Sequence, residues 1–548
     1  MCNPPSTTTA PLSSRSSNDA ETETAPRPGD AAAATTTTTV RRCRVVIAGA
    51  GPAGLLLQAL LHLRNQKSSS SSTTTRHVLY EITLVESRQD LGQLSLDVLQ
   101  SQHRSWMIGL AGHGLEAVRS VPGLYDNYLA NIGVKLTEGA LYIGKKKITM
   151  GSGVPEGAEG FIVDRNFIVA ALARYAKDNL ETSEYYTPKY ETELLYVDHE
   201  KHRILLRDKA TQVESYMSYD LLVGADGIRS TVREALVKKH FDFELQVGDI
   251  FSVFKAVHIE RPESLSPSSI SFLPSCMPYF NGICLPETNG LINLSVGVPR
   301  NAFDSISDEL KSNDPTVVAQ YLKKNFTPFQ LSDEAYLDWA TQWTNQRWNR
   351  TGQVHCNRYS SVECKIVMMG DSVHATSPSI GMGMNTALRD AQKFIELMDI
   401  HDDDLTKVLP QYSIDRVPEG NALTHLALNL YCFDMKVQMQ SVVKGIVRSG
   451  LNYLFPSYVN PDPNAIIGLP HVSLSEVYHM AMEQGVIAKH RMINLRIRQD
   501  HFEKEVGMVK DKQKESSSGS LLALLSKTSM VMVPAAACAM AMMLVKSS

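Results

Sequence analysis

The sequence has few of the features that mark a disulfide scaffold, a metal centre or a nucleic-acid binder. Its 548 residues include eight cysteines. None of them forms a CxxC pair, and the two C-x7-C pairs lack the spacing of zinc ligands. The formal net charge is −4, so no basic excess attracts phosphate backbones. We therefore expect reduced structural thiols, no metal site and no nucleic-acid partner.

The first 40 residues differ from the rest of the chain. They consist mainly of Ser, Thr, Ala and Pro, which cannot build a core, so we expect residues 1–40 to be disordered. A transit peptide is the alternative, but the acidic Asp19, Glu21, Glu23 and Asp30 argue against it.

The other end of the chain is apolar. Residues 528–545 carry no charge, and Lys527 and Lys546 flank them. Eighteen uncharged residues are the short limit for a bilayer span, and the polar stretch 510–520 is typical of a linker. We predict a C-terminal tail anchor that associates the protein with a membrane and faces the cytosol. An apolar helix packed on the protein body is the alternative.

The middle of the chain begins with an apolar run interrupted by glycines, VVIAGAGPAGLLLQALL at residues 45–61. The residues before the glycines predict a buried strand, and the Leu-rich residues after them predict a helix. Gly49 permits a tight turn, Gly51 lets the backbone approach a pyrophosphate, and Gly54 lets helix and strand pack closely. The helix N-terminus then faces the phosphates. The pattern predicts a dinucleotide-binding loop made of Gly49, Gly51, Pro52, Ala53 and Gly54.

A second predicted strand, residues 77–87, ends in an acidic residue. Glu86 there would bind a ribose diol, and an ordinary solvated acid is the alternative. It lies 32 residues after Gly54, beyond the usual ~20, because a Ser/Thr-rich insertion lengthens the connection. No second GxGxxG motif has a strand–turn–helix context, which favours one tightly held dinucleotide.

Two further motifs make the interpretation specific. Residues 220–233 read DLLVGADGIRSTVR and contain the pair Asp226-Gly227, and residues 370–385 read GDSVHATSPSIGMGMN. With the glycine-rich loop, these segments resemble the three motifs of the FAD-dependent aromatic-ring monooxygenases, the class A flavoprotein hydroxylases, in the same order. The resemblance implies FAD as the bound cofactor and NAD(P)H as a transient co-substrate.

The resemblance also assigns roles to single residues. Asp371 would accept hydrogen bonds from ribityl hydroxyls, and Asp226 with Gly227 would form the second cofactor-binding turn. Backbone amides at a helix start would meet the flavin pyrimidine ring and stabilise negative charge there. Pro378 would border the oxygen-reacting face. The other cofactor-binding candidates are Arg165, Gly381, Gly383, Met384 and Asn385.

Other segments are similar to the kynurenine 3-monooxygenase family. Residues 103–111 resemble its segment with an arginine near flavin and substrate, so Arg104 is a candidate for binding either one. Tyr431 aligns with a family tyrosine, and Arg104, Pro378 and Tyr431 are the catalytic candidates. The chain departs from the family at residues 273–275, which read Leu-Pro-Ser instead of Trp-Pro-Arg. The identity of the aromatic substrate therefore stays open.

We expect an α/β protein of several domains, since one core cannot hold a chain this long: a Rossmann-type FAD-binding domain, an antiparallel-sheet substrate domain and a C-terminal helical region. The predicted function is hydroxylation of a small aromatic substrate with NAD(P)H and O2. An FAD-dependent dehydrogenase or reductase without oxygen insertion, and a non-catalytic FAD-binding scaffold, are the alternatives. The predicted boundaries are 1–40 for the disordered segment, 41–245 and 351–400 for the FAD-binding domain, 246–350 for the substrate-domain sheet and helix, 401–509 for the helical region, and 510–548 for the linker and apolar tail.

Overall fold

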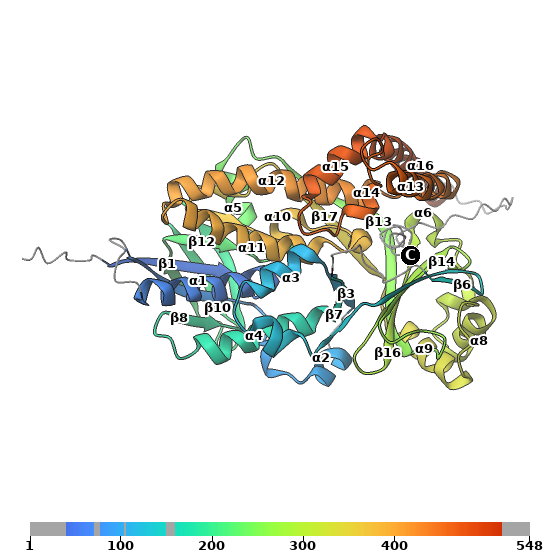
Figure 1. Ribbon diagram of the computed structural model, residues 1–548, viewed down its shortest axis with the longest axis horizontal. Helices are drawn as coiled ribbons and strands as arrows, with labels where there is room; N and C mark the ends of the chain where they lie inside the picture. Colours follow the sequence, from blue (N-terminus) through green and yellow to red (C-terminus); the bar gives the residue numbers. More distant parts are fainter. Residues whose placement is uncertain (1–39, 71–76, 103–105, 150–158, 518–548) are drawn as a thin grey trace, which may run out of the picture. The chain divides into compact units, whose positions relative to one another are not determined.

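Figure 1 shows the computed structural model of the chain, which describes residues 40–70, 77–102, 106–149 and 159–517. The predicted disordered segment up to residue 39, the apolar tail and Arg104 lie outside the described residues. Within the described ranges, no helix is both long and apolar enough to cross a membrane. The last described helix continues to Ser517, through the first residues of the predicted linker.

The first sheet carries the glycine-rich loop. Its strand order is β18-β19-β12-β1-β2-β8. β1 runs parallel to both β2 and β12, and β12 runs parallel to β19. Residues 45–48 of β1 are all buried, as expected for a parallel strand covered on both faces. The strands are β1 (Val40–Ala48), β2 (His77–Val85), β8 (Tyr186–Lys189), β12 (Leu221–Gly224), β18 (Ser360–Ser361) and β19 (Ile366–Met368).

Helices from distant parts of the sequence pack around this sheet. α1 (Pro52–Ser70) starts directly after the glycine-rich turn and contacts α4 (Arg165–Leu180) and α11 (Gly383–Ile400). α12 (Leu405–Asn429) lies beside α11 (Figure 1). One hydrophobic core joins β1, β12, β19 and these helices. Segments from before residue 245 and from after residue 356 therefore form one folded unit.

The second sheet is mostly antiparallel. Its order is β17-β13-β16-β15-β14-β5-β6, and all neighbours are antiparallel except β14 and β5. The long β13 pairs first with β17, where Leu245 lies opposite Cys356, and then with β16. The strands are β5 (Glu138–Ile143), β6 (Lys146–Thr149), β13 (Leu245–Glu260), β14 (Ser269–Met277), β15 (Phe280–Pro286), β16 (Leu291–Pro299) and β17 (Asn349–Cys356).

Two helices, α8 (Pro315–Asn325) and α9 (Asp333–Asn345), share a hydrophobic core with one face of this sheet. Asp314 begins α8 by accepting a hydrogen bond from the Thr316 amide, which is an N-cap. Trp339 and Trp343 of α9 are fully buried. Val318 and Leu322 of α8, which are one helical turn apart, are also buried in this core.

The remaining elements are shorter or lie in the C-terminal region. Two three-stranded sheets have the orders β3-β7-β4 and β11-β10-β9. Their strands are β3 (Met107–Leu110), β4 (Gly133–Lys135), β7 (Phe161–Asp164), β9 (Thr192–Asp198), β10 (Arg203–Asp208) and β11 (Glu214–Ser218). The other helices are η1 (Leu91–Gln93), α2 (Leu96–Gln102), α3 (Gly112–Arg119), η2 (Tyr125–Leu129), α5 (Thr231–Lys239), α6 (Arg300–Phe303), α7 (Asp308–Lys311), α10 (Asp371–His374), η3 (Pro378–Ile380), α13 (Met435–Leu454), α14 (Pro463–Ile466), α15 (Leu474–Glu483) and α16 (Val486–Ser517).

These elements confirm the predicted fold class. The Rossmann-type unit, the antiparallel sheet and the helical C-terminal region are all present. Six cysteines fall in the described part of the chain, and all six are buried and free. This agrees with the expectation of reduced thiols that serve as small apolar core residues.

A lysine is buried in the core of the second sheet. Lys255 is 5% exposed, and its ammonium donates a hydrogen bond to the Trp343 carbonyl at 2.5 Å. The rings of Trp343 and Trp348 lie 4.7 and 5.0 Å from it, within cation–π distance. Trp343 is in the last turn of α9, where the helix dipole favours a cation. Burial nevertheless lowers the pKa of Lys255 to about 8.

The lowered pKa of Lys255 predicts a specific pH dependence of stability. Its folded-state pKa of about 8 lies below its ordinary 10.5, so between these values the unfolded chain binds more protons. The free energy of unfolding should therefore rise between about pH 8 and 10.5, as the buried Lys255 loses its proton. Below pH 8 the charged Lys255 should destabilise the folded state to its full extent. In Lys255→Met this rise should be absent when urea unfolding is measured across that range. Parallel pH profiles of the two proteins would contradict it.

Candidate active site

The three predicted cofactor segments leave the first sheet side by side. They follow β1, β12 and β19, of which β12 lies between the other two. Ala225 donates its backbone N–H to the Ala48 carbonyl at 2.8 Å, and Met369 donates to the Gly224 carbonyl at 3.0 Å. Ligands of open α/β sheets bind beyond the carboxyl ends of such strands. The three motifs therefore meet at one edge of one sheet.

The glycines of the first loop have different reasons to be glycine. Gly49 has a φ of +106°, and a Cβ on it would lie 2.2 Å from the Ala225 carbonyl oxygen. A Cβ on Gly54 would lie 2.2 Å from the Gly49 carbonyl oxygen. A Cβ on Gly51 would come no closer than 3.9 Å to the protein. The fold thus needs glycine at positions 49 and 54, whereas the bare backbone of Gly51 leaves room for a ligand directly before Pro52 begins α1.

Glu86 stands where the second strand of the predicted unit ends. It is 7% exposed, and its carboxylate accepts hydrogen bonds from the Ala50 amide at 2.9 Å and from the Arg88 amide and side chain at 2.9 and 3.1 Å. Burial favours protonation, but the charge and hydrogen bonds of Arg88 and the Ala50 amide lower the pKa of Glu86 overall. A small pocket lies beside it, lined also by Leu91, Val169 and Tyr190. An ionised acceptor beside a cavity suits a ribose diol.

Asp226 has one satisfied and one unsatisfied oxygen. Its Oδ2 accepts hydrogen bonds from the Thr231 and Val232 amides at 2.8 and 3.1 Å, at the start of α5. Its Oδ1 is buried and has no hydrogen-bond partner in the described part of the chain. Burial raises the pKa of Asp226 above its ordinary value. A buried acceptor normally finds a donor, and a ligand hydroxyl is one. Gly227 follows with a φ of +77° and forms the turn.

The third motif rests on a buried charge network. Asp390 of α11 is fully buried and accepts hydrogen bonds from the Gly370 amide at 2.8 Å, His374 at 2.6 Å and Arg416 at 2.7 Å. Burial opposes its ionisation, but the charges of His374 and Arg416 hold the pKa of Asp390 below its ordinary value. The network fixes the Gly370 turn. Asp371, the next residue, is exposed to solvent. The same turn contacts the first loop, since a Cβ on Gly370 would lie 3.6 Å from that of Ala53.

The loop from Pro378 to Asn385 ends on a helix start that no side chain caps. Gly381 has a φ of +67°, and its amide bonds the Pro378 carbonyl at 3.0 Å. The amides of Gly383, Met384 and Asn385 occupy the first turn of α11, where no intrahelical acceptor exists. They are suited to the electron-rich edge of a flavin ring.

The side chain of Asn385 braces this loop. Its Oδ1 accepts from the Ala111 amide at 2.8 Å, and its Nδ2 donates to the Gly109 and Gly381 carbonyls, both at 2.9 Å. The amide group therefore joins the loop to the segment that connects β3 with α3. We assign it a positioning role, which leaves cofactor contact to the Asn385 backbone.

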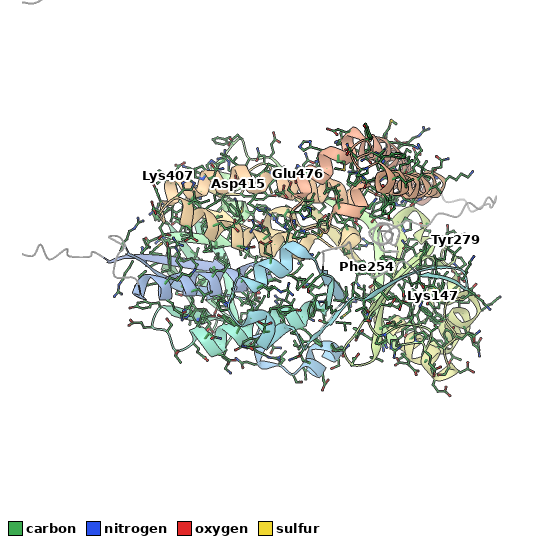
Figure 2. All side chains as sticks on the ribbon, viewed as in Figure 1. Lys147, Phe254, Tyr279, Lys407, Asp415 and Glu476 are labelled. Carbon is green, nitrogen blue, oxygen red and sulfur yellow. The ribbon has the colours of Figure 1, made fainter. Side chains whose placement is uncertain are left out.

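The remaining predicted residues lie toward the second sheet. The Arg165 guanidinium lies 4.7 Å from the centre of the Trp106 ring, and that ring lies edge-on to Phe254 of β13 at 6.0 Å. Figure 2 marks the position of Phe254. Tyr431 is buried in an apolar cluster with Ile380 of the flavin loop. Arg104, which sequence comparison with the family favoured, is outside the described residues.

The face of the second sheet that carries Phe254 is partly polar. Strand register places Asn281 and Ser295 on that face, together with Asn293, which lies opposite His258. Asn293 is fully buried, and its Nδ2 has no hydrogen-bond partner within the described ranges. Its Oδ1 accepts a hydrogen bond from Ser295 at 3.1 Å. The face thus offers a buried donor that remains unpaired.

Sequence reasoning did not single out Asp390, Arg416, Trp106 or Asn293. Asp390 did leave a signal, because it falls in the apolar stripe of its helix between Ala387 and Phe394. An acid at such a position predicts a buried charge with a cationic partner. The other three have no local pattern, since their partners are distant in sequence.

Comparison with known proteins agrees with this geometry. Residues 169–426 match the family described as FAD binding domain. Violacein synthase of Chromobacterium violaceum is 26% identical over 70% of this chain and 84% of its own length. Kynurenine 3-monooxygenase of Neurospora crassa is 24% identical over 81% of this chain and 89% of its own. A mutant of 2-methyl-3-hydroxypyridine-5-carboxylic acid oxygenase has the same fold, with a TM-score of 0.53 at 16% identity over 71% of this chain and 90% of that one.

The chain is similar to the FAD-dependent aromatic-ring monooxygenases. It is a flavoprotein enzyme, and FAD is its cofactor. The described residues fit that cofactor at three places: the room above Gly51, the unsatisfied Oδ1 of Asp226 and the uncapped start of α11. Glu86, which accepts a hydrogen bond from the Ala50 amide, stays the predicted fourth contact at the ribose end.

Gly51→Ala should separate folding from cofactor binding. The new methyl meets no protein atom within 3.9 Å, so the thermal midpoint of the apoprotein should be unchanged. It occupies the approach of the pyrophosphate, so FAD affinity should fall at least about tenfold, as measured by titration of flavin fluorescence. Gly248→Ala is the matched control, because a Cβ there meets nothing within 4 Å. Unchanged FAD affinity in Gly51→Ala would contradict the assignment.

Asp390→Asn should weaken both the fold and the cofactor turn. It leaves Arg416 as a buried cation without its counter-charge, which costs about 3–5 kcal/mol in the free energy of unfolding. The control is Asp415→Asn on α12 (Figure 2), whose partly exposed pair with Lys393 spans 3.1 Å. That change should cost about 1 kcal/mol or less. Equal losses in the two variants on urea unfolding would argue against a special role of the buried network.

Proposed function

We propose that the enzyme hydroxylates a small aromatic substrate with a polar side group, of the kind acted on by kynurenine 3-monooxygenases, and consumes NAD(P)H and O2. The observation that carries the proposal is the face of the second sheet around Phe254, which combines aromatic and amide side chains. Trp106 and Asn385 connect this face to the flavin loop. The relatives named kynurenine 3-monooxygenase support the substrate class.

Bound FAD supplies the redox chemistry, because it accepts two electrons from NAD(P)H and activates O2 for transfer to the ring. The residues of the chain bind, orient and shield. Glu86 and Asp226 hold hydroxyl groups, and the first amides of α11 stabilise negative charge on the ring system. Trp106, next to β3, and Phe254 of the second sheet place apolar surface between these two elements, which limits the access of water to the site.

The proposed substrate contacts come from the second sheet and from the segments that carry Pro378 and Tyr431. The buried amide nitrogen of Asn293 donates to a carbonyl or carboxylate oxygen of the substrate, and the Phe254 ring packs on its apolar part. Pro378 and Tyr431 remain the proposed boundary of the reacting face, which the cluster of Tyr431 with Ile380 supports. Arg104 remains a prediction for a cation that pairs with a substrate carboxylate or contacts the flavin.

The test is NADPH and NADH oxidation by the FAD-loaded protein across a panel of small aromatic compounds that includes L-kynurenine. We expect oxidation to rise with an accepted compound and the product to gain one oxygen atom, as measured by mass spectrometry. Oxidation that yields only hydrogen peroxide with every compound would overturn the hydroxylase proposal. Oxygen-independent turnover would favour a dehydrogenase or reductase, and flavin that no nicotinamide cofactor reduces would favour a scaffold.

A further inference from the structure

Helix α13 has its apolar side turned outward. Val443, Val447, Leu451 and Leu454 recur at helical spacing on one face and are 56, 55, 43 and 65% exposed. The opposite face carries Gln438, Ser449 and Asn452, which are buried. Among the side chains of α13 that the structure describes, these aliphatic ones therefore face outward and these polar ones face inward.

Specific hydrogen bonds fix this orientation of α13. Gln438 accepts from the Cys432 amide at 2.7 Å, and Asn452 donates to the Val459 carbonyl at 2.5 Å. Ser441 bonds His490 of α16 at 2.8 Å. Rotation of the helix would break these bonds, so the outward apolar face is built into the fold.

Aromatic side chains at the end of the helix and just beyond it extend the apolar face. Tyr453, Phe455 and Tyr458 are 69, 52 and 90% exposed. Scattered exposed apolar residues are common, but a contiguous set of this kind marks an interaction surface. Tyrosine suits the boundary between water and an apolar phase, because its ring is apolar and its hydroxyl is polar. We call the outward residues of α13, together with these three aromatics, the α13 face.

The charge around the α13 face has one sign. Residues 435–461 contain Lys436, Lys444 and Arg448 and no acidic residue, in a chain whose net charge is −4. The first part of α16, residues 486–499, also lacks acids and adds the exposed cations Lys489, Arg491 and Arg496. Figure 1 shows the two helices close together, and the bond between Ser441 and His490 confirms the contact. An apolar surface rimmed by cations complements an anionic amphipathic surface and disfavours pairing with a second copy of itself.

We propose that the α13 face docks on the surface of a membrane that contains anionic lipids. The apolar and aromatic side chains enter the boundary between headgroups and acyl chains, and the lysines reach lipid phosphates. The helix lies in the plane of the membrane and does not span it. The contact is separate from the active site and from the predicted tail anchor, so it depends on neither.

The test uses the full-length, FAD-loaded chain with phosphatidylcholine vesicles that contain either no phosphatidylserine or a third of it. Hydroxyl-radical footprinting measures the accessibility of Tyr453, Phe455 and Tyr458. We expect anionic vesicles to protect these side chains and neutral vesicles to leave them accessible. Because the readout is on the α13 face itself, membrane contact made elsewhere in the chain does not produce the result.

Two paired variants probe the two components of the face. Lys444→Glu with Arg448→Glu should raise the concentration of anionic vesicles needed for half-maximal protection by at least about fivefold per residue. Val447→Asp with Leu451→Asp should abolish the protection. Ile414→Asp on α12 is the matched control, since Ile414 is 65% exposed and lies outside the face. Unchanged flavin spectra and NADPH oxidation show that the variants fold.

Three results would overturn the proposal. If neutral vesicles protected the three aromatic side chains as well as anionic vesicles do, anionic lipids would not be required for docking. Protection before vesicles are added would assign the face to another segment of the chain or, if it grows with protein concentration, to a second copy. An equal effect of Ile414→Asp would show that the α13 face has no special role.

Discussion

Two backbone hydrogen bonds between neighbouring strand ends, Ala225 to Ala48 and Met369 to Gly224, decide where everything else in the site can lie. They hold three segments that are far apart in sequence at one edge of one sheet. Gly49 extends the arrangement on the other side, because its amide bonds the Val85 carbonyl at 2.8 Å directly before Glu86. The acids that follow these strands, Glu86, Asp226 and Asp371, therefore belong to the edge of the sheet where we predict the cofactor to bind.

The protein uses buried charge in two different ways. Asp390 accepts hydrogen bonds from three donors, one of them the guanidinium of Arg416, so its desolvation is compensated and the Gly370 turn is held in one conformation. Lys255 has a carbonyl and two aromatic rings, which compensate the ammonium only in part. The first arrangement lies beneath the cofactor site, where precise geometry is needed. The second lies under the far face of the second sheet, where it joins β13 to α9.

The sequence was sufficient to predict the βαβ unit and the three cofactor segments, because each depends on residues that are neighbours in the chain. The apolar run before Gly49 and the glycines at fixed spacing encode both the strand and the turn. The bracing role of Asn385 was beyond this approach, since its partners Gly109 and Ala111 lie some 270 residues away. The orientation of α13 was equally hidden. Its apolar spacing predicts a helix, but only the bonds of Gln438 and Asn452 decide which side faces inward.

The pairing of Leu245 with Cys356 has a consequence for how such proteins diversify. Residues 245–356 form most of the second sheet, and this stretch begins and ends at adjacent positions, whereas β5 and β6 come from residues 138–149. Lengthening, shortening or replacing this stretch should change which substrate the second sheet accepts. It should leave the predicted cofactor-binding segments unchanged. This arrangement would let one FAD-binding unit be combined with second sheets of different sequence and length, and so with different substrates.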